Sequence, residues 1–248
     1  MIECFRHMGA GPNEQLRDSE TQIRENVFRV QERIAAACHR AGRRSEDVTL
    51  IGISKTVPAE RIRQAYNAGL RHFGENRVQE ATAKRPDVSD LTVTWHFIGH
   101  LQANKAKAAR ELFHWIHSVD SHHLAERLDK AAVCEGERLA VLVEVNLGEE
   151  TTKSGARESE VATLIDRIRH FPTLEVRGLM TIPPFFENPE HTRPFFRRLR
   201  EMANKIEAMR LENISMRELS MGMSNDFEVA IEEGATLIRV GTAIFGSR

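Results

Sequence analysis

After residue 48 the chain alternates short apolar segments with helical segments eight times, and this alternation limits its fold more than any other feature. The apolar segments are rich in β-branched residues, which is typical of buried strands. Strands that alternate with helices pair in parallel. Eight such units in about 200 residues predict a closed (β/α)8 barrel, a fold that takes ~250 residues. A doubly wound open sheet is the alternative.

The predicted strands lie at 48–55, 71–76, 93–99, 115–120, 139–146, 174–181, 218–222 and 237–240. The helices between them are predicted at 58–68, 78–84, 104–112, 121–135, 158–170, 189–209 and 226–232. Ser121 is the expected cap of the helix that it begins. No linker or low-complexity stretch divides these units, so we expect one domain at 20–248.

An extra amphipathic helix is predicted at 20–41, before the first strand. Ile23, Val27, Val30 and Ile34 recur at helical spacing, and Gly42 follows at a plausible C-terminal cap. Residues 1–19 mix glycine, proline and charges without an apolar core, so we predict a flexible extension and no signal peptide.

The composition excludes several classes of protein. A net charge of -1 provides no general attraction to nucleic acid or to a membrane. The longest apolar runs are far shorter than the roughly 20 residues that span a bilayer. The three cysteines are far apart and form no CxxC pair, which fits a reducing compartment and argues against a disulfide framework. A cytoplasmic protein is the simplest interpretation.

Lys55 closes the first predicted strand, at the end where α/β folds place their chemistry. An amine partly removed from water has a lowered pKa and can attack a carbonyl carbon. Taken alone, such a lysine also fits a side chain that reaches from a strand end into water.

The loops after the last two predicted strands carry the features of a phosphate site. Glycine lets backbone amides approach an anion at Gly241, and Ser224 and Thr242 can donate hydroxyl protons. A helix that begins after Ser224 would add a favourable dipole. Each loop alone would also fit an ordinary capped turn. A lysine nucleophile and a phosphate site at one barrel end indicate pyridoxal 5′-phosphate (PLP).

Arg239 precedes the second of these loops and could approach the pyridine nitrogen of PLP. A guanidinium at that place disfavours protonation of the nitrogen, because two cations would meet. An unprotonated ring is a weaker electron sink, so we expect poor carbanion chemistry.

At these residues the chain resembles the PLP homeostasis protein family, also called the YggS/PROSC family. The matching segments are 53–56 (ISKT), 73–76 (FGEN), 95–102 (WHFIGHLQ), 153–155 (KSG), 178–180 (GLM), 219–224 (LSMGMS) with Asp226, and 239–246 (RVGTAIFG). They keep their order and cover nearly everything after residue 20.

The resemblance implies a single modified barrel like the N-terminal domain of alanine racemase. It implies PLP on Lys55 as an internal aldimine, with Arg239 facing the pyridine nitrogen. The implied phosphate contacts are Ser224, Gly241 and Thr242. Asn76 and Met221 are implied to line the ring.

The resemblance also implies a function, that of a non-catalytic PLP carrier or buffer that affects vitamin B6 and amino/keto acid balance. A monomer is implied, with apo PLP-dependent enzymes as candidate recipients. One departure stands out, because Val57 occupies the position where many members carry a second lysine. Lys153 is then either an accessory amine or a surface lysine.

The alternative function is a fold-type III racemase or decarboxylase. Racemisation needs an acid/base group on each face of the substrate, and Lys55 supplies one. The single tyrosine, Tyr66, falls within a helix, where we expect a partly buried structural role. The lack of an evident second acid/base group favours the carrier, and we predict no catalytic residue. His96 and His100 complete no known ligand spacing, so we expect no metal and place the His96 segment at the barrel mouth.

Overall fold

The computed structural model describes residues 12–132, 136, 138–148 and 154–246. Its strands are β1 (Thr49–Ile53), β2 (His72–Glu75), β3 (Thr94–Phe97), β4 (Trp115–Val119), β5 (Leu139–Asn146), β6 (Ala156–Arg157), β7 (Leu174–Met180), β8 (Ile214–Met223) and β9 (Leu237–Val240). The α-helices are α1 (Pro12–Arg40), α2 (Ala59–Asn67), α3 (Val78–Lys84), α4 (Ala106–Leu112), α5 (His122–Asp129), α6 (Glu158–Ile168), α7 (Arg193–Ala208), α8 (Phe227–Glu232) and α9 (Thr242–Phe245). Short 3-10 turns lie at Ser45–Asp47, Arg85–Val88, Ala103–Lys105 and Pro189–Thr192.

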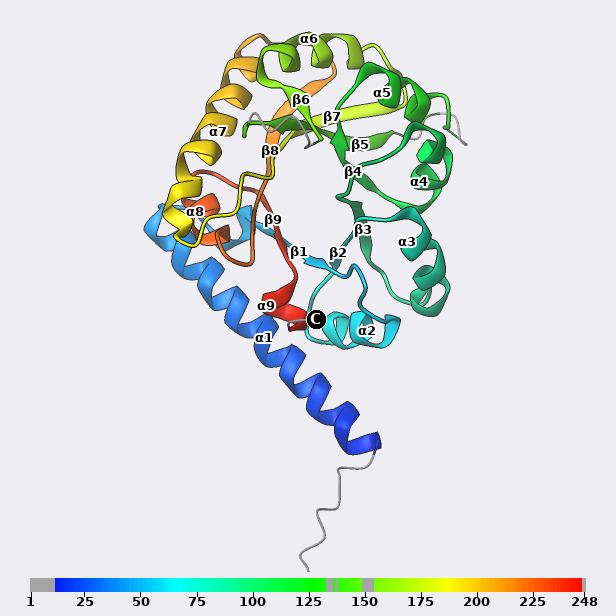
Figure 1. The fold of residues 1–248 in the computed structure, drawn as a ribbon, viewed down its shortest axis with the longest axis vertical. Coiled ribbons are helices and arrows are strands. Elements are labelled where there is room, and N and C mark those ends of the chain that lie inside the picture. Colours follow the sequence, from blue (N-terminus) through cyan, green and yellow to red (C-terminus); the bar gives the residue numbers. More distant parts are fainter. Residues whose placement is uncertain (1–11, 133–135, 137, 149–153, 247–248) are drawn as a thin grey trace, which may run out of the picture.

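The parallel strands form a closed barrel with helices around it (Figure 1). Around the ring the order is β1, β2, β3, β4, β5, β7, β8 and β9, and β9 pairs with β1. The pairing of β4 with β5 completes the ring, so the predicted barrel is confirmed and the open sheet is excluded. The two-residue β6, which pairs with β5, was not predicted.

Several elements have the predicted bounds, and others differ for local reasons. α3, β5 and β9 match, and the Ser121 hydroxyl accepts the Leu124 amide as the expected cap of α5. The first strand ends at Ile53 rather than at Lys55, because the chain turns at Ser54 and the Val57 amide bonds the Ser54 carbonyl. α5 ends at Asp129, earlier than predicted.

α1 packs on the outside of the barrel against α2, α8 and α9. The predicted apolar face is confirmed, since Ile23, Val27, Val30 and Ile34 are all buried. The helix begins at Pro12 rather than at residue 20, within the segment predicted to be a flexible extension. Residues 1–11 lie outside the described part, so the division at residue 19 stays a prediction.

The apolar core has two parts that the barrel wall separates. The larger cluster lies between the strands and the surrounding helices, where Phe196 of α7 is fully buried. The smaller cluster is formed by Ile51, Ile53, Leu142, Met180 and Leu237. These residues project from four strands on opposite sides of the ring, so they fill the barrel interior. Within residues 12–132, 136, 138–148 and 154–246, no helix has the length and apolar character to cross a membrane.

Candidate functional site

The predicted site residues gather at one end of the barrel. Lys55 and Asn76 follow β1 and β2, and Ser224 follows β8. Arg239 is the next-to-last residue of β9, and Gly241 and Thr242 follow the strand. Because all barrel strands run parallel, these positions share the carboxyl end of the barrel, where barrel enzymes place their sites.

The backbone on both sides of Lys55 is held by a buried polar frame. The Ser54 hydroxyl donates to Glu75 Oε1 at 2.7 Å, and Lys84 Nζ donates to both the Ser54 carbonyl (2.7 Å) and Glu75 (2.9 Å). The Thr56 amide donates to Glu80 Oε2 at 2.8 Å. Thr56 has a φ of 61°, an unfavourable conformation for a β-branched residue, and such strain concentrates at functional sites.

Glu75 is fully buried, and this burial raises the pKa of its carboxyl group against the opposing hydrogen bonds from Ser54 and Lys84. The Lys84 ammonium, mostly buried beside it, is the compensating charge. Sequence reasoning missed this frame. The available signal was the place of Glu75 directly before Asn76 at a strand end.

Asn76 carries an unsatisfied acceptor at the barrel mouth. Among the described residues, its buried Oδ1 has no hydrogen-bond partner. The chain after β3 passes so close that a Cβ on Gly99 would lie 2.3 Å from the Asn76 carbonyl oxygen, which requires glycine there. A buried amide oxygen without a partner is costly, so this atom fits a site for a ligand donor or a bound water.

The Ser224 hydroxyl links the two predicted phosphate loops. Its Oγ accepts the Gly241 amide at 3.2 Å and the Ala243 amide at 3.4 Å. Ser224 therefore lies at the beginning of α9, whereas the helix that follows it in sequence, α8, begins at Phe227 with Asp226 at its N-cap. A favourable dipole from the helix after Ser224 stays a prediction, and the Ser224 hydroxyl also contacts the first turn of α9.

The loop that carries Ser224 is anchored at both ends. The Met223 amide donates to the buried Asp226 carboxylate at 2.6 Å. Gly222 has a φ of 90°, and a Cβ there would lie 2.6 Å from that of Ala230, so a larger residue does not fit. Met221 is fully buried in the cluster that the strands share with the helices, which leaves its backbone as the part that could face a ligand.

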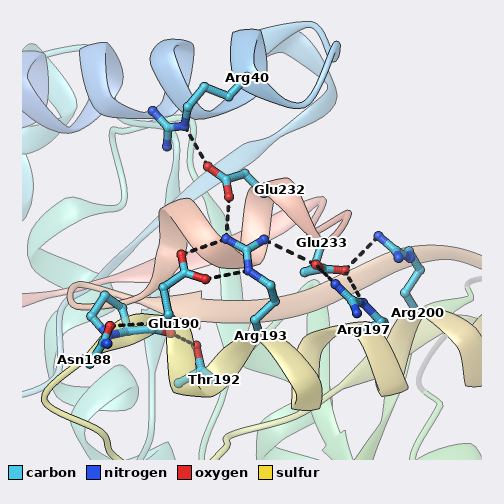
Figure 2. Close-up of polar contacts among 10 residues, drawn as sticks. Arg40, Asn188, Glu190, Thr192, Arg193, Arg197, Arg200, Glu232 and Glu233 are labelled. Carbon is cyan, nitrogen blue, oxygen red and sulfur yellow. Dashed lines mark hydrogen bonds and ion pairs between the residues drawn. The ribbon is translucent and has the colours of Figure 1, made fainter.

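A network of ion pairs fixes α8 behind this loop (Figure 2). Arg193 of α7 contacts Glu232 at 2.7 Å and Glu233 at 3.3 Å, at the end of α8. Arg40 of α1 reaches Glu232 from the other side at 2.7 Å. Ion pairs from α1 and α7 thus hold α8, the helix that follows the Ser224 loop.

Arg239 is the cation at the centre of the site. Its side chain is 3% exposed, and burial lowers its pKa to about 10 against the opposing charges of Asp226 and Glu144. Nη1 donates to the Ser220 hydroxyl at 2.6 Å, and Nη2 donates to the Thr181 carbonyl at 2.9 Å. These bonds leave further N–H groups of the guanidinium for a ligand.

Histidines occupy the barrel interior below Arg239. His96 is 1% exposed and lies between His72 and His117, at 3.0 and 2.9 Å between ring nitrogens. The prediction that the His96 segment lines the barrel mouth is wrong for this side chain, which points into the barrel. Among the described residues, no group of three or more histidine, cysteine and acidic side chains is arranged for a metal ion. Lys153 lies outside the described residues.

The comparisons with known proteins agree with this geometry. A family model described as the alanine racemase N-terminal domain matches residues 22–248. A pyridoxal phosphate homeostasis protein of Aquifex aeolicus is 49% identical over 224 residues, covering 90% of this chain and 97% of that protein. The Escherichia coli K12 protein of the same name is 41% identical and covers 91% of this chain and 97% of its own length.

Solved structures have the same fold. PipY of Synechococcus elongatus, solved with PLP bound, superposes with a TM-score of 0.80 at 40% identity, covering 91% of this chain and all of that one (100%). The alanine racemase of Corynebacterium glutamicum has a TM-score of 0.69 at 16% identity, covering 92% of this chain and 62% of that one, a likeness of fold alone. The chain therefore belongs to the pyridoxal phosphate homeostasis protein family, whose barrel is that of the alanine racemase N-terminal domain.

Proposed function

We propose that this protein binds PLP at the carboxyl end of the barrel and takes part in PLP homeostasis and amino/keto acid balance, as a carrier without turnover. Lys55 Nζ is the amine that would bond the aldehyde carbon, and Ser224, Gly241 and Thr242 would hold the phosphate. Arg239 would meet the ring nitrogen, with Asn76 and the Met221 backbone beside the ring. When bound, PLP supplies an aldehyde and an electron-accepting ring.

The residues present fit such a ligand. The observation that carries the proposal is a wholly buried guanidinium at the same barrel end as a lysine and two convergent hydroxyl-glycine loops. The unpartnered Asn76 Oδ1 adds a polar atom that the described protein groups leave unsatisfied. The relatives named for PLP homeostasis and the PLP-bound PipY structure support the same ligand.

Two features favour a carrier over an enzyme. Arg239 is positively charged and would oppose protonation of the ring nitrogen, which weakens the ring as an electron sink. Tyr66, the only tyrosine, lies in α2 with its ring 3.9 Å below the Arg71 guanidinium, at the amino end of the barrel strands. It therefore cannot serve as a second acid/base group beside Lys55. The expected partly buried structural role of Tyr66 is confirmed.

The first experiment is the visible absorption spectrum of the purified protein, followed by borohydride reduction and peptide mass mapping. We expect a yellow, reducible chromophore fixed on Lys55. The exposed Lys107→Ala variant is the matched control and should keep the chromophore, whereas Lys55→Ala should lose it. A protein that remains colourless after addition of PLP would refute the proposal.

A second experiment isolates the phosphate contacts. Ser224→Ala should weaken binding of PLP about tenfold, a loss of ~1.4 kcal/mol, but leave binding of unphosphorylated pyridoxal unchanged. Ser89→Ala is the control, because the Ser89 hydroxyl only bonds the Pro86 carbonyl at the other end of the barrel. Equal losses for both ligands would contradict the assigned role of Ser224.

The absence of turnover is tested by α-proton exchange of amino acids in deuterated water. We expect exchange no faster than with free PLP. His100 follows β3 at the barrel mouth, 3.7 Å from Asp120, so His100→Phe is included as the variant that removes this candidate acid/base pair. Sustained exchange that His100→Phe abolishes would instead establish a racemase-like enzyme. A cytoplasmic location, a monomeric state and apo-enzyme recipients stay predictions.

A further inference from the structure

We propose that His72, His96, His117 and Ser220 form a hydrogen-bonded positioning chain that fixes Arg239 and supports its positive charge beside the ligand ring. This inference rests on the proposed function, because it assigns to Arg239 the task of meeting the ring nitrogen. We refer to the four residues as the histidine chain.

The histidine chain runs through the whole barrel. His72 is the first residue of β2, at the amino end, and is half-buried. The next two links follow the neighbouring strands β3 and β4, from His72 Nδ1 to His96 Nε2 (3.0 Å) and from His96 Nδ1 to His117 Nε2 (2.9 Å). The chain then crosses the interior, since β4 and β8 are separated around the ring by β5 and β7. His117 Nδ1 lies 2.9 Å from Ser220 Oγ, which accepts from Arg239.

The chemistry of arginine sets the direction of every proton in the chain. A guanidinium can only donate, so Ser220 Oγ accepts from Arg239. The Ser220 hydroxyl proton then points to His117 Nδ1, because the opposite arrangement would leave a buried O–H without an acceptor. His117 therefore carries its proton on Nε2 and donates to His96 Nδ1.

The same alternation of donor and acceptor applies to the rest of the histidine chain. His96 carries its proton on Nε2 and donates to Nδ1 of His72. All three imidazoles are thus Nε2–H tautomers whose Nδ1 lone pairs face back along the chain toward Arg239. Neutral rings are required for this pattern, and burial lowers the pKa values of His96 and His117 well below the ordinary value.

This polarity compensates a buried charge that has no close counter-ion. Within the described part of the chain, Arg239 makes no ion pair, and the Glu144 and Asp226 carboxylates act on it from beyond hydrogen-bond distance. Burial raises the pKa of Glu144 to about 7, so its negative charge is only partly present near neutral pH. Oriented dipoles with their acceptor ends toward a cation stabilise it without adding charge.

Apolar and aromatic groups hold the rings in place. The Trp115 ring stacks on His96 with centroids 5.8 Å apart and an interplanar angle of 23°. Met180 and Leu142 belong to the interior apolar cluster against which Trp115 packs. The rings therefore cannot turn freely to exchange one nitrogen for the other, which preserves the direction of the chain.

The test that needs no ligand is nitrogen NMR of the ¹⁵N-histidine-labelled apo-protein at pH 7. We expect His72, His96 and His117 as neutral Nε2–H tautomers. An Nδ1–H tautomer or an imidazolium at His96 or His117 would overturn the proposal. Because this readout involves no PLP, it decides the polarity of the chain even if the proposed function fails.

The second measurement asks whether the chain acts on Arg239. His117→Phe removes the acceptor for Ser220, and His117→Asn restores an acceptor near the position of Nδ1. We expect His117→Phe to speed exchange of the Arg239 guanidinium protons in the apo-protein and to raise the dissociation constant for PLP about tenfold, with a shifted absorption maximum. His117→Asn should recover most of both properties, and the exposed control His123→Gln should match the parent.

A purely structural role for His117 predicts a different outcome. In that case, His117→Asn and His117→Phe would change stability alone, with parental guanidinium exchange and a parental absorption spectrum at full occupancy, and this result would overturn the proposal. If parent and variants all fail to bind PLP, the proposed function is refuted, while guanidinium exchange still decides whether the chain holds Arg239.

Discussion

Replacing Glu144 by glutamine should remove a large part of the pH dependence of this protein's stability. Glu144 lies on β5, 7% exposed, on the same strand face as the interior residue Leu142. Burial and the nearby charge of Asp120 raise its pKa from 4.5 to about 7, although Arg239 acts in the opposite direction. The folded state therefore keeps a proton that the unfolded chain releases.

The direction in which stability changes with pH follows from this difference in bound protons. Between pH 4.5 and 7 the folded protein holds one more proton than the unfolded chain, so stability falls as the pH rises through this range. The contribution of the Glu144 carboxyl is fully present below pH 4.5 and is lost above pH 7. The interval is about 2.5 pH units at ~1.36 kcal/mol for each, which gives an effect on the order of 3 kcal/mol. Between pH 5 and pH 8 we expect roughly 2.5 kcal/mol of it.

The assay is urea unfolding of the apo-protein at pH 5 and pH 8, for the parent and for Glu144→Gln. The variant carries no titrating group at this position. From pH 5 to pH 8 its free energy of unfolding should therefore decrease by roughly 2.5 kcal/mol less than that of the parent. The buried histidines contribute equally to both proteins and cancel in the comparison. The exposed Glu212→Gln variant should follow the parent. Parallel curves for the parent and Glu144→Gln would show that Glu144 is ionised in the folded protein, and would refute the reasoning.

Three further predictions follow from the site and its supports. Lys55→Ala should leave the free energy of unfolding of the apo-protein within roughly 0.5 kcal/mol of the parent, measured by urea unfolding, because a half-exposed strand-end lysine contributes little to packing; a larger loss would assign Lys55 a structural role. Gly222→Ala should cost about 3 kcal/mol and weaken PLP binding, because its Cβ would overlap that of Ala230; a parental melting temperature would contradict the geometry. Arg193→Ala should lower stability by about 2 kcal/mol, measured by thermal unfolding, because the buried Glu233 carboxylate would lose one of its arginine partners. An unchanged transition would show that the network is dispensable.

Local pattern accounts for most of what could be predicted. Buried strands are short, nearly continuous apolar runs and helices bury one face, and these patterns are present in the sequences of β5, β9 and α3. The barrel follows from counting the units, and the gathering of Lys55 and Arg239 at one end follows from parallel strands. One place where prediction failed is the turn at Ser54, where a backbone hydrogen bond ends the strand before its apolar pattern ends.

Contacts between distant residues depended on tertiary structure. Whether Ser224 serves the helix that follows it or the loop after β9 depends on how the chain folds back, and the periodicity of a strand carries no information on that path. The link from His117 to Ser220 joins residues 103 positions apart and exists because the ring closes, which brings β4 and β8 within reach of each other across the interior. Sequence alone determined that successive side chains along each strand face opposite sides of the barrel wall, because side chains alternate. Only barrel closure and the stagger of its strands decided which of the inward residues meet, because side-chain distances across the interior are set by the geometry of the whole ring.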